Sequence, residues 1–149
     1  MKRLKVWLPA LLWMGVIFVM SAMPGDVSGD QSGMLVSIVL SIVSFFFGEK
    51  AAAGISIDLI HLLIRKAAHM TEYAILFFLY HRALRRENAK RPGLYALLLC
   101  ALYASTDEFH QGFVAGRGPS AQDVGIDTLG AGIAWFFESI YKKIKKRSN

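Results

Sequence analysis

The sequence is poor in cysteine and in charged residues. Cys100 is the one cysteine among 149 residues, so no disulfide and no cysteine-based zinc cluster can form within the chain. Charged residues make up 19% of the chain and hydrophobic residues 54%, the reverse of the balance that keeps a chain disordered. The length is typical of one domain, and no repeat or linker divides the sequence. We therefore predict a single domain over residues 1–149.

The basic residues are unevenly distributed along the chain. There are 17 Lys and Arg against 11 Asp and Glu, which gives a net charge of +6. An excess of positive charge can indicate nucleic-acid binding, but here the basic residues flank long apolar segments, as in the cytoplasmic loops of membrane proteins. We therefore expect no nucleic-acid partner. The three clusters are Lys2, Arg3 and Lys5; Arg82, Arg85, Arg86, Lys90 and Arg91; and Lys142, Lys143, Lys145, Lys146 and Arg147.

Four predominantly apolar segments are long enough to cross a bilayer as helices. Residues 6–25 contain no charged residue, and about 20 helical residues span the ~30 Å of a hydrocarbon core. A basic start before an apolar stretch also fits a cleaved signal peptide. Because Met20, Met23 and Pro24 interrupt the small residues of a cleavage site, we favour an uncleaved span. The other predicted spans are residues 66–82, 92–110 and 123–141.

The positive clusters also predict the topology. All three are cytoplasmic only if an even number of crossings separates each pair, and four spans with both termini in the cytoplasm satisfy this condition. If residues 31–48 crossed alone, the second cluster would lie outside, and residues 55–64 are amphipathic but too short to span. The sequence thus predicts an all-α, polytopic membrane helical bundle with a re-entrant or interfacial helical segment at about 31–64. A loop after the first span is predicted by Pro24, Gly25, Gly29 and Gly33.

Polar residues gather at one end of three predicted spans, on the extracytoplasmic side of this topology. Arg65, His69 and Glu72 have the spacing i, i+4, i+7 and share one helical face. A charge in hydrocarbon costs several kcal/mol, so these side chains should face the bundle interior and meet in one pocket. The predicted site consists of Arg65, Lys66, His69, Glu72, Asp107, Glu108, Gln111, Arg117, Ser120, Asp123 and Asp127.

Two simpler interpretations stay open for the same residues. Charges at helix ends can lie in the headgroup region at little cost, and pairs such as Arg65–Glu72 or Arg117–Asp123 can serve only to fix helix packing. Cys100 lies among leucines and is expected to be a packed thiol. The last span also has a small-residue surface that favours close helix packing, formed by Gly125, Gly130, Ala131, Gly132 and Ala134.

The motifs resemble those of the VanZ-like family. Residues 65–73, RKAAHMTEY, are similar to the family's R-K-x-x-H-x-x-E-Y. Residues 107–117, DEFHQGFVAGR, are similar to D-E-x-H-Q-x-F-x-P-G-R, with Ala115 in place of proline. The matched positions run from about 21 to 130. The family's S-x-x-P corresponds to Ser21 and Pro24, and its S-x-x-D-x-x-x-[DN]-x-x-G corresponds to Ser120, Asp123, Asp127 and Gly130.

The resemblance implies a small multi-pass bacterial membrane protein. With the topology predicted above, we expect it in the bacterial cytoplasmic membrane with both termini in the cytoplasm. The founding member of the family is linked to low-level resistance to teicoplanin, a lipoglycopeptide antibiotic, and the family has no settled reaction. The expected partners are the lipid bilayer and an amphiphilic molecule: a lipid, a lipid-linked cell-wall precursor or a lipoglycopeptide. The sequence names no cofactor.

The mixture of acids, bases and a histidine suggests two main hypotheses. In an enzyme, His69 would be the general acid or base, oriented by Glu72 or Asp107, with Glu108 and Asp123 as further catalytic carboxylates. In a non-catalytic binder, the same pocket would hold a polar headgroup. A transporter is disfavoured because the polar groups cluster away from the midplane, and a purely structural bundle is the fourth alternative. The predicted binding residues are Arg65, Lys66, Gln111, Arg117, Ser120 and Asp127, with Ser120 also a weak candidate nucleophile.

The same residue types could also bind a metal ion. Histidine and carboxylate ligands suit zinc or manganese. The neighbouring cations Arg65 and Lys66 would repel such an ion, so we predict no metal. The candidate ligands would have been His69, Glu72, Asp107, Glu108 and His110.

Overall fold

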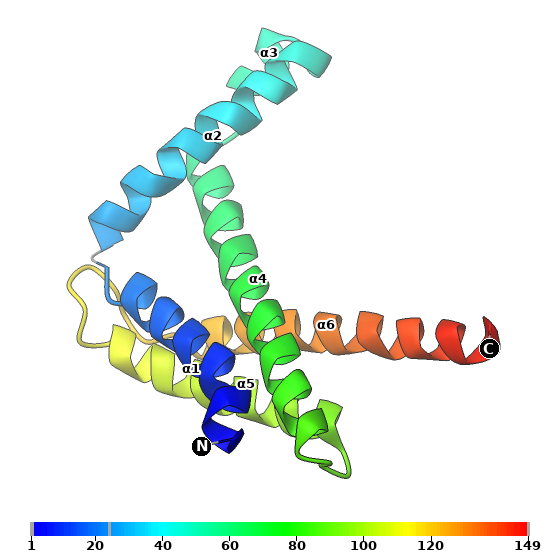
Figure 1. The fold of residues 1–149 in the computed structure, drawn as a ribbon. Coiled ribbons are helices and arrows are strands. Elements are labelled where there is room, and N and C mark those ends of the chain that lie inside the picture. Colours follow the sequence, from blue (N-terminus) through cyan, green and yellow to red (C-terminus); the bar gives the residue numbers. More distant parts are fainter. Residues whose placement is uncertain (1, 24, 149) are drawn as a thin grey trace.

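The computed structural model describes residues 2–23 and 25–148, and all regular structure in these residues is helical (Figure 1). This confirms the predicted all-α class. The helices follow one another with short connections, except for the loop that precedes the last one. They are α1 (Lys2–Ser21), α2 (Gly25–Phe47), α3 (Glu49–Ala53), α4 (Ile57–Arg86), α5 (Pro92–Gln111) and α6 (Ala121–Ser148).

Local signals account for where three of the helices begin. Pro92 starts α5, where its fixed φ suits a first turn and its missing N–H is not needed. The Ser56 hydroxyl caps α4 by accepting a hydrogen bond from the Leu59 amide at 3.4 Å. The Ser120 hydroxyl does the same for α6, where it accepts from the Asp123 amide at 3.3 Å.

The segment between the first two predicted spans differs from the prediction. Helix α2 includes Gly25, Gly29 and Gly33, so the loop predicted from these residues is wrong, while Pro24 lies outside the described residues. A glycine costs a helix only about 1 kcal/mol, which does not by itself end one that continues into an apolar segment. The re-entrant or interfacial position predicted for residues 31–64 stays a prediction.

Helix α4 joins two segments that the sequence analysis treats separately. It covers most of the amphipathic stretch 55–64 and all of the predicted span 66–82 in one helix of 30 residues. Arg65 and Lys66 interrupt the hydropathy between the two, but both residue types favour helix. Two adjacent basic residues therefore interrupt the apolar pattern of the sequence but do not interrupt the helix.

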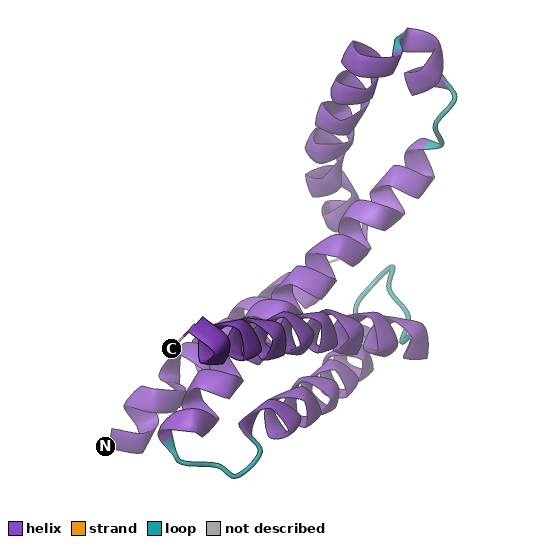
Figure 2. Cartoon of the chain, turned by 90° about the vertical axis from the view of Figure 1, so that its right-hand side faces the viewer, coloured by secondary structure: helices purple, strands orange, loops and turns teal. Residues whose placement is uncertain are grey.

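Helices α1, α4, α5 and α6 form the bundle. Helix α4 packs against the other three and crosses α6 steeply, and α5 packs along α6 (Figure 1). Helices α2 and α3, together with the beginning of α4, project from the bundle as a helical hairpin (Figure 2). The hairpin and the bundle meet near the middle of α4, which carries the first of the two sequence motifs.

The buried face of α5 explains how this interior becomes polar at one end. Before its last turns it presents Ala96, Cys100 and Ala104, small residues that let α4 and α6 approach closely. Its last turn presents Asp107, Glu108 and Gln111 on the same face, and all three are buried. One continuous helical stripe therefore changes from small and apolar to ionisable. Around it the core is completed by Ala10, Ile17, Tyr73, Leu76, Phe77, Tyr80, Ala131 and Ala134.

Large apolar side chains cover the outside of the bundle. Leu102 and Phe109 on α5 are 65% and 70% exposed, and Phe136 on α6 is 62% exposed. A soluble protein seldom exposes so many large apolar side chains, and a lipid environment accounts for them. Among the described residues, one helical segment, Arg3–Ser21, has the length and apolar composition of a membrane span. The crossings predicted at 66–82, 92–110 and 123–141 stay predictions.

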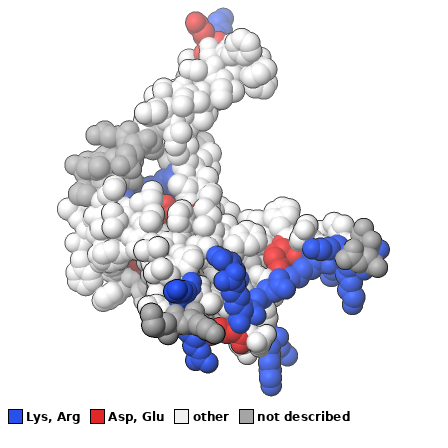
Figure 3. Space-filling view, in the orientation of Figure 1, with Lys and Arg blue, Asp and Glu red and all other residues white. Residues whose placement is uncertain are grey.

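Positive charge gathers at the bundle end away from the hairpin. In Figure 3 the Lys and Arg side chains lie mainly over the lower and right-hand parts, where Figure 1 has the α4–α5 connection and the C-terminal half of α6. Beneath this surface, His81 Nε2 lies 3.7 Å from Glu138 Oε1, and Lys142 pairs with the same carboxylate. The asymmetry agrees with the positive-inside rule, on which the predicted orientation rests.

Several hydrogen bonds fasten α1 to the bundle, and one of them gives a stability prediction. The Tyr103 hydroxyl donates to the Met14 carbonyl at 2.6 Å, and the Trp13 indole donates to the Glu72 carbonyl at 2.9 Å. Tyr103→Phe should cost about 1 kcal/mol and lower the melting temperature of the purified protein by a few degrees. Tyr95→Phe, on the exposed side of the same helix, is the control. Equal melting temperatures for the two variants would contradict the anchoring role.

Candidate functional site

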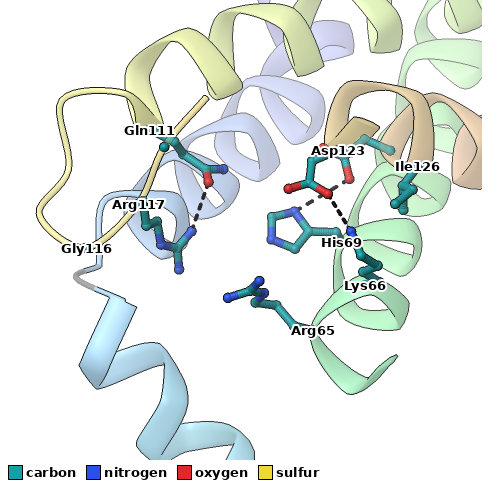
Figure 4. A pocket seen from close by; sticks show the side chains of 10 residues that line it. Arg65, Lys66, His69, Gln111, Gly116, Arg117, Asp123 and Ile126 are labelled. Atoms are coloured by element: carbon teal, nitrogen blue, oxygen red, sulfur yellow. Dashed lines mark hydrogen bonds and ion pairs between the residues drawn. The ribbon is translucent and has the colours of Figure 1, made fainter. Parts of the chain in front are cut away.

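The predicted site residues meet where α4, the last turn of α5, the α5–α6 loop and the start of α6 come together. They line a pocket of about 150 Å³ (Figure 4). The lining is mostly polar, and Ile126 is its one large apolar side chain. Seven predicted residues contribute to it: Arg65, Lys66, His69, Gln111, Arg117, Asp123 and Asp127.

Two ion pairs join α4 to α6 across the floor of this pocket. Lys66 Nζ lies 2.6 Å from Asp123 Oδ1, and both side chains are about one-third exposed. One helical turn further along each helix, His69 Nδ1 lies 3.5 Å from Asp127 Oδ1 (Figure 4). The Asp127 side chain is completely buried, whereas that of His69 is 20% exposed. The sequence analysis oriented His69 with Glu72 or Asp107, but the structure instead places Asp127 beside it.

A chain of hydrogen bonds connects α5 to Arg117 on the loop. The Gln111 amide donates to Asp107 Oδ2 at 3.2 Å, and Arg117 Nη1 donates to Gln111 Oε1 at 3.3 Å. Gly116, immediately before Arg117, has a φ of +74°, which side chains other than glycine rarely adopt. The glycine thus permits the turn that precedes the arginine, and Asp107 acts behind Gln111 rather than at the pocket surface.

Glu108 and Ser120 hold the loop rather than line the pocket. Glu108 is buried, and its Oε2 accepts a hydrogen bond from the Ser120 amide at 2.9 Å. Since the Ser120 hydroxyl is the cap of α6, both polar groups of this residue are engaged in closing the loop. Their catalytic and binding roles stay predictions, and the geometry adds a structural one.

An apolar pocket of about 190 Å³ adjoins the polar one. Its walls come from the end of α1, from Leu35 on α2 and from α4. Arg65, His69 and Arg117 line both pockets and so form the boundary between them. Glu72 lies on the apolar side of this boundary. The apolar lining consists of Met20, Met23, Leu35, Ile64 and Ala68.

Several buried polar atoms around the two pockets have no hydrogen-bond partner. Both Asp127 oxygens, Asp107 Oδ1 and His69 Nδ1 are among them. Buried polar groups in proteins are nearly always hydrogen-bonded, and leaving one unsatisfied costs about 1–3 kcal/mol. A cluster of such atoms is therefore expected where water or a ligand supplies the missing partners. The remaining atoms are Ser21 Oγ, Tyr73 OH, Glu108 Oε1, His110 Nδ1 and Arg117 Nε.

A family model described as VanZ/LLP1 matches residues 6–142, which is nearly the whole chain. The chain belongs to this family. The match includes α1 and both motif segments, in agreement with the resemblance seen in the sequence. No curated protein and no solved structure matches the chain.

Two neighbouring arginines contribute to the electrostatics of this VanZ/LLP1 site. Burial and the proximity of Arg65 lower the pKa of Arg117 from its ordinary value, and nearby carboxylates act in the opposite direction. Arginine nevertheless stays protonated at physiological pH. Arg65 makes no hydrogen bond or ion pair in the part of the chain that the structure describes. Two positive charges therefore adjoin the same space, and only Arg117 has a polar partner, the neutral Gln111.

The candidate metal ligands do not converge in this VanZ/LLP1 fold. Among the residues whose side chains the structure describes, no three histidine, cysteine or carboxylate side chains are placed to share a metal ion. Glu108 is engaged with the Ser120 amide, and the His110 ring instead lies against Phe18, with ring centroids 4.4 Å apart and the ring planes tilted by 39°.

Two polar residues of the VanZ/LLP1 site were not predicted. Ser21 lines the apolar pocket and is 3% exposed, and Tyr73 is completely buried beside the site. Both belong to the family-like motifs, so the motif pattern was a signal that could have identified them. The apolar wall formed by Met20 and Met23 gives no such signal, because nothing in the sequence separates these residues from the span.

Proposed function

We propose that this VanZ/LLP1 protein binds an amphiphilic molecule of the bacterial cell envelope, or a lipoglycopeptide, in the two adjoining pockets at the extracytoplasmic face. The observation that carries this proposal is the shared boundary of Arg65, His69 and Arg117 between a polar and an apolar pocket. An amphiphile has a polar head joined to an apolar tail. A site with two compartments of matching character is suited to such a molecule.

We further propose that His69 transfers a proton to or from the polar head of the ligand. Its Nδ1 lies 3.5 Å from the buried Asp127 carboxylate, and its ring lines both pockets. A carboxylate on one ring nitrogen orients a histidine and stabilises its charged form, while the other nitrogen is left for the reaction. His69 would then be the general acid or base, and Asp127 the group that orients it.

Non-catalytic binding is the second candidate, and one observation favours it. Ser120 is the only hydroxyl in the predicted site, and it is engaged as the cap of α6. Among the described residues, no hydroxyl or thiol lines the polar pocket beside His69, and the Ser21 hydroxyl lines only the apolar one. Sequestration of a ligand would need the same two compartments without turnover, so a time course with the bound amphiphile distinguishes the candidates: a chemically altered product supports catalysis.

The function is tested first by drug susceptibility. A sensitive bacterial host that expresses the chain should tolerate more teicoplanin than the host alone, with vancomycin, which has no lipid tail, measured in parallel. We expect His69→Ala, Glu72→Gln, Asp107→Asn and Arg117→Lys to remove most of this protection when their membrane levels match the wild type. The readout is the minimal inhibitory concentration of each drug.

Ser105→Ala is the matched control for this experiment. Ser105 is exposed on the opposite side of α5, two residues before Asp107, and its hydroxyl bonds only to the Ala101 carbonyl. Protection by the control but not by the site variants would locate the function in the pockets. Undiminished protection by all four site variants would refute that location, and no protection by the wild type would detach this chain from the resistance role.

A further inference from the structure

The boundary between the two pockets carries two arginine side chains, Arg65 and Arg117, neither of which forms an ion pair with a described carboxylate. Three cationic side chains line the polar pocket, Arg65, Lys66 and Arg117, together with two carboxylates. Lys66 is paired with Asp123 at 2.6 Å, and the buried Asp127 faces His69. Within the described residues, the two arginines are left without a carboxylate partner.

The two arginines approach the same space from different elements. Figure 4 shows Arg65 reaching from α4 and Arg117 from the loop, and the His69 ring lies beside them. Two guanidinium groups on a shared wall repel each other, and an anion between them would be stabilised by both. Asp107, Glu108 and Glu72 also attract Arg117, but none of them lies within ion-pair distance of it. The unpartnered, buried Nε of Arg117 is a further donor for such an anion.

The number of donors indicates the kind of anion. Each guanidinium presents several N–H groups in a planar fork that matches the oxygens of a carboxylate or a phosphate. One carboxylate has two oxygens in a single plane, so a second fork can reach it only through the lone pairs that the first leaves unused. A phosphate group can offer oxygens to two forks at once, and the adjoining apolar pocket has room for hydrocarbon attached to it.

We infer that the ligand of this site is a phosphate ester carried on a lipid, with the phosphate held between Arg65 and Arg117 and the hydrocarbon in the pocket lined by α1, α2 and α4. The inference rests on the proposed function and specifies its substrate class. His69 then lies next to the phosphate ester oxygens. Proton transfer to or from the ligand would therefore occur at the headgroup rather than along the tail.

The test compares three probes on the purified full-length protein in detergent. Phosphatidylglycerol carries both phosphate and hydrocarbon, diacylglycerol with the same acyl chains lacks the phosphate, and glycerol phosphate lacks the hydrocarbon. Dissociation constants are measured by competition against a fluorescent phosphatidylglycerol. We expect phosphatidylglycerol to bind at least about tenfold more tightly than either of the other probes, because only it uses both compartments.

The variants separate the two compartments. Arg65→Gln and Arg117→Gln should each weaken phosphatidylglycerol binding by about tenfold to a hundredfold and leave diacylglycerol binding unchanged. Ala68→Phe, which fills the apolar side, should weaken both lipids and spare glycerol phosphate. Arg86→Gln is the control, because Arg86 is an exposed arginine at the far end of α4. A folding defect in one variant leaves the other variants and the comparison of probes intact.

The outcomes are distinguishable. Loss of the phosphatidylglycerol preference in both arginine variants supports the inference. If phosphatidylglycerol and diacylglycerol bind equally well, and the arginine variants do not change this, then Arg65 and Arg117 do not hold a phosphate. Binding of an amphiphile would still stand. If glycerol phosphate binds as tightly as phosphatidylglycerol, the ligand is a free phosphate compound and the inferred lipid is wrong. Binding of none of the probes overturns the inference, and teicoplanin protection by the same protein would show that the proposed function survives with another ligand.

Discussion

Gly130→Ala is expected to destabilise the protein more than any other single methyl addition on α6. A Cβ at position 130 would lie 2.7 Å from the Met70 Cα and 2.9 Å from its carbonyl carbon. Both are backbone atoms of α4, so a side-chain rotation cannot relieve the contact. Overpacking costs about 1–3 kcal/mol, and we expect a melting temperature lower by up to about 10 °C. Thermal unfolding of the detergent-purified protein measures the change.

Gly132→Ala provides the matched control on the same helix. A Cβ at position 132 meets nothing within 4 Å, and alanine is favoured over glycine in a helix by up to about 1 kcal/mol. The control should therefore melt at or slightly above the wild-type temperature. If Gly130→Ala melted as late as Gly132→Ala, the close approach of α4 and α6 would be wrong.

The same contact sets the geometry of the polar site. Met70 follows His69 directly, and Gly130 lies one turn after Asp127 on α6. Along the two helices, Lys66–Asp123, His69–Asp127 and Met70–Gly130 are successive contacts. Separation of the helices at Gly130 would widen the distance between His69 and Asp127, so a partly folded Gly130→Ala protein should also lose function. The small-residue surface predicted from the sequence thus has one member that is essential to the site.

The sequence predicted the individual helices better than their arrangement. Helix α5 agrees with the predicted span 92–110 because a proline starts it and a glycine follows its last residue. Helix α4 was predicted too short because a hydropathy pattern is divided by Arg65 and Lys66, while the helix backbone is not. The 3.6-residue period within a single helix was therefore enough to predict that polar residues of α5 share a face. It also predicted the shared face of Arg65, His69 and Glu72 on α4.

Partners across helices required the three-dimensional structure. Arg65–Glu72 and Arg117–Asp123 were plausible pairs by charge, but Asp123 pairs with Lys66, and Arg65 has no partner among the described residues. Such pairing depends on how steeply α4 crosses α6, which no spacing within one helix determines. The apolar pocket was also outside the reach of the sequence, since its walls come from three separate helices.

Asp127→Asn is expected to remove function while leaving the stability of the protein unchanged or higher. The Asp127 side chain is completely buried, neither of its oxygens has a hydrogen-bond partner, and its nearest charged neighbour is His69 Nδ1 at 3.5 Å. A buried carboxylate with so little compensation costs several kcal/mol of desolvation, more than a neutral amide of the same shape. The amide relieves this cost but no longer stabilises a protonated His69. Where His69 transfers protons, activity should fall by about 10²–10⁴-fold.

Two measurements on the same variants separate this role from a packing ion pair. Thermal unfolding reports stability, and teicoplanin protection at matched membrane levels reports function. Asp123→Asn is the comparison, because it removes the carboxylate of a partly exposed pair that contributes only about 0–1 kcal/mol. If Asp127 mainly fixes helix packing, its removal should instead cost about 3–5 kcal/mol and leave protection in proportion to the protein that remains folded.

The double variant His69→Gln with Asp127→Asn tests in a second way whether Asp127 orients His69 or only fixes helix packing. Two groups that act as one unit have grossly non-additive effects on function, because the second loss removes nothing further. The double variant should then be no less protective than His69→Gln alone. Additive losses of function would mean that the two residues act separately, and Asp127 would lose its place as the group that orients His69.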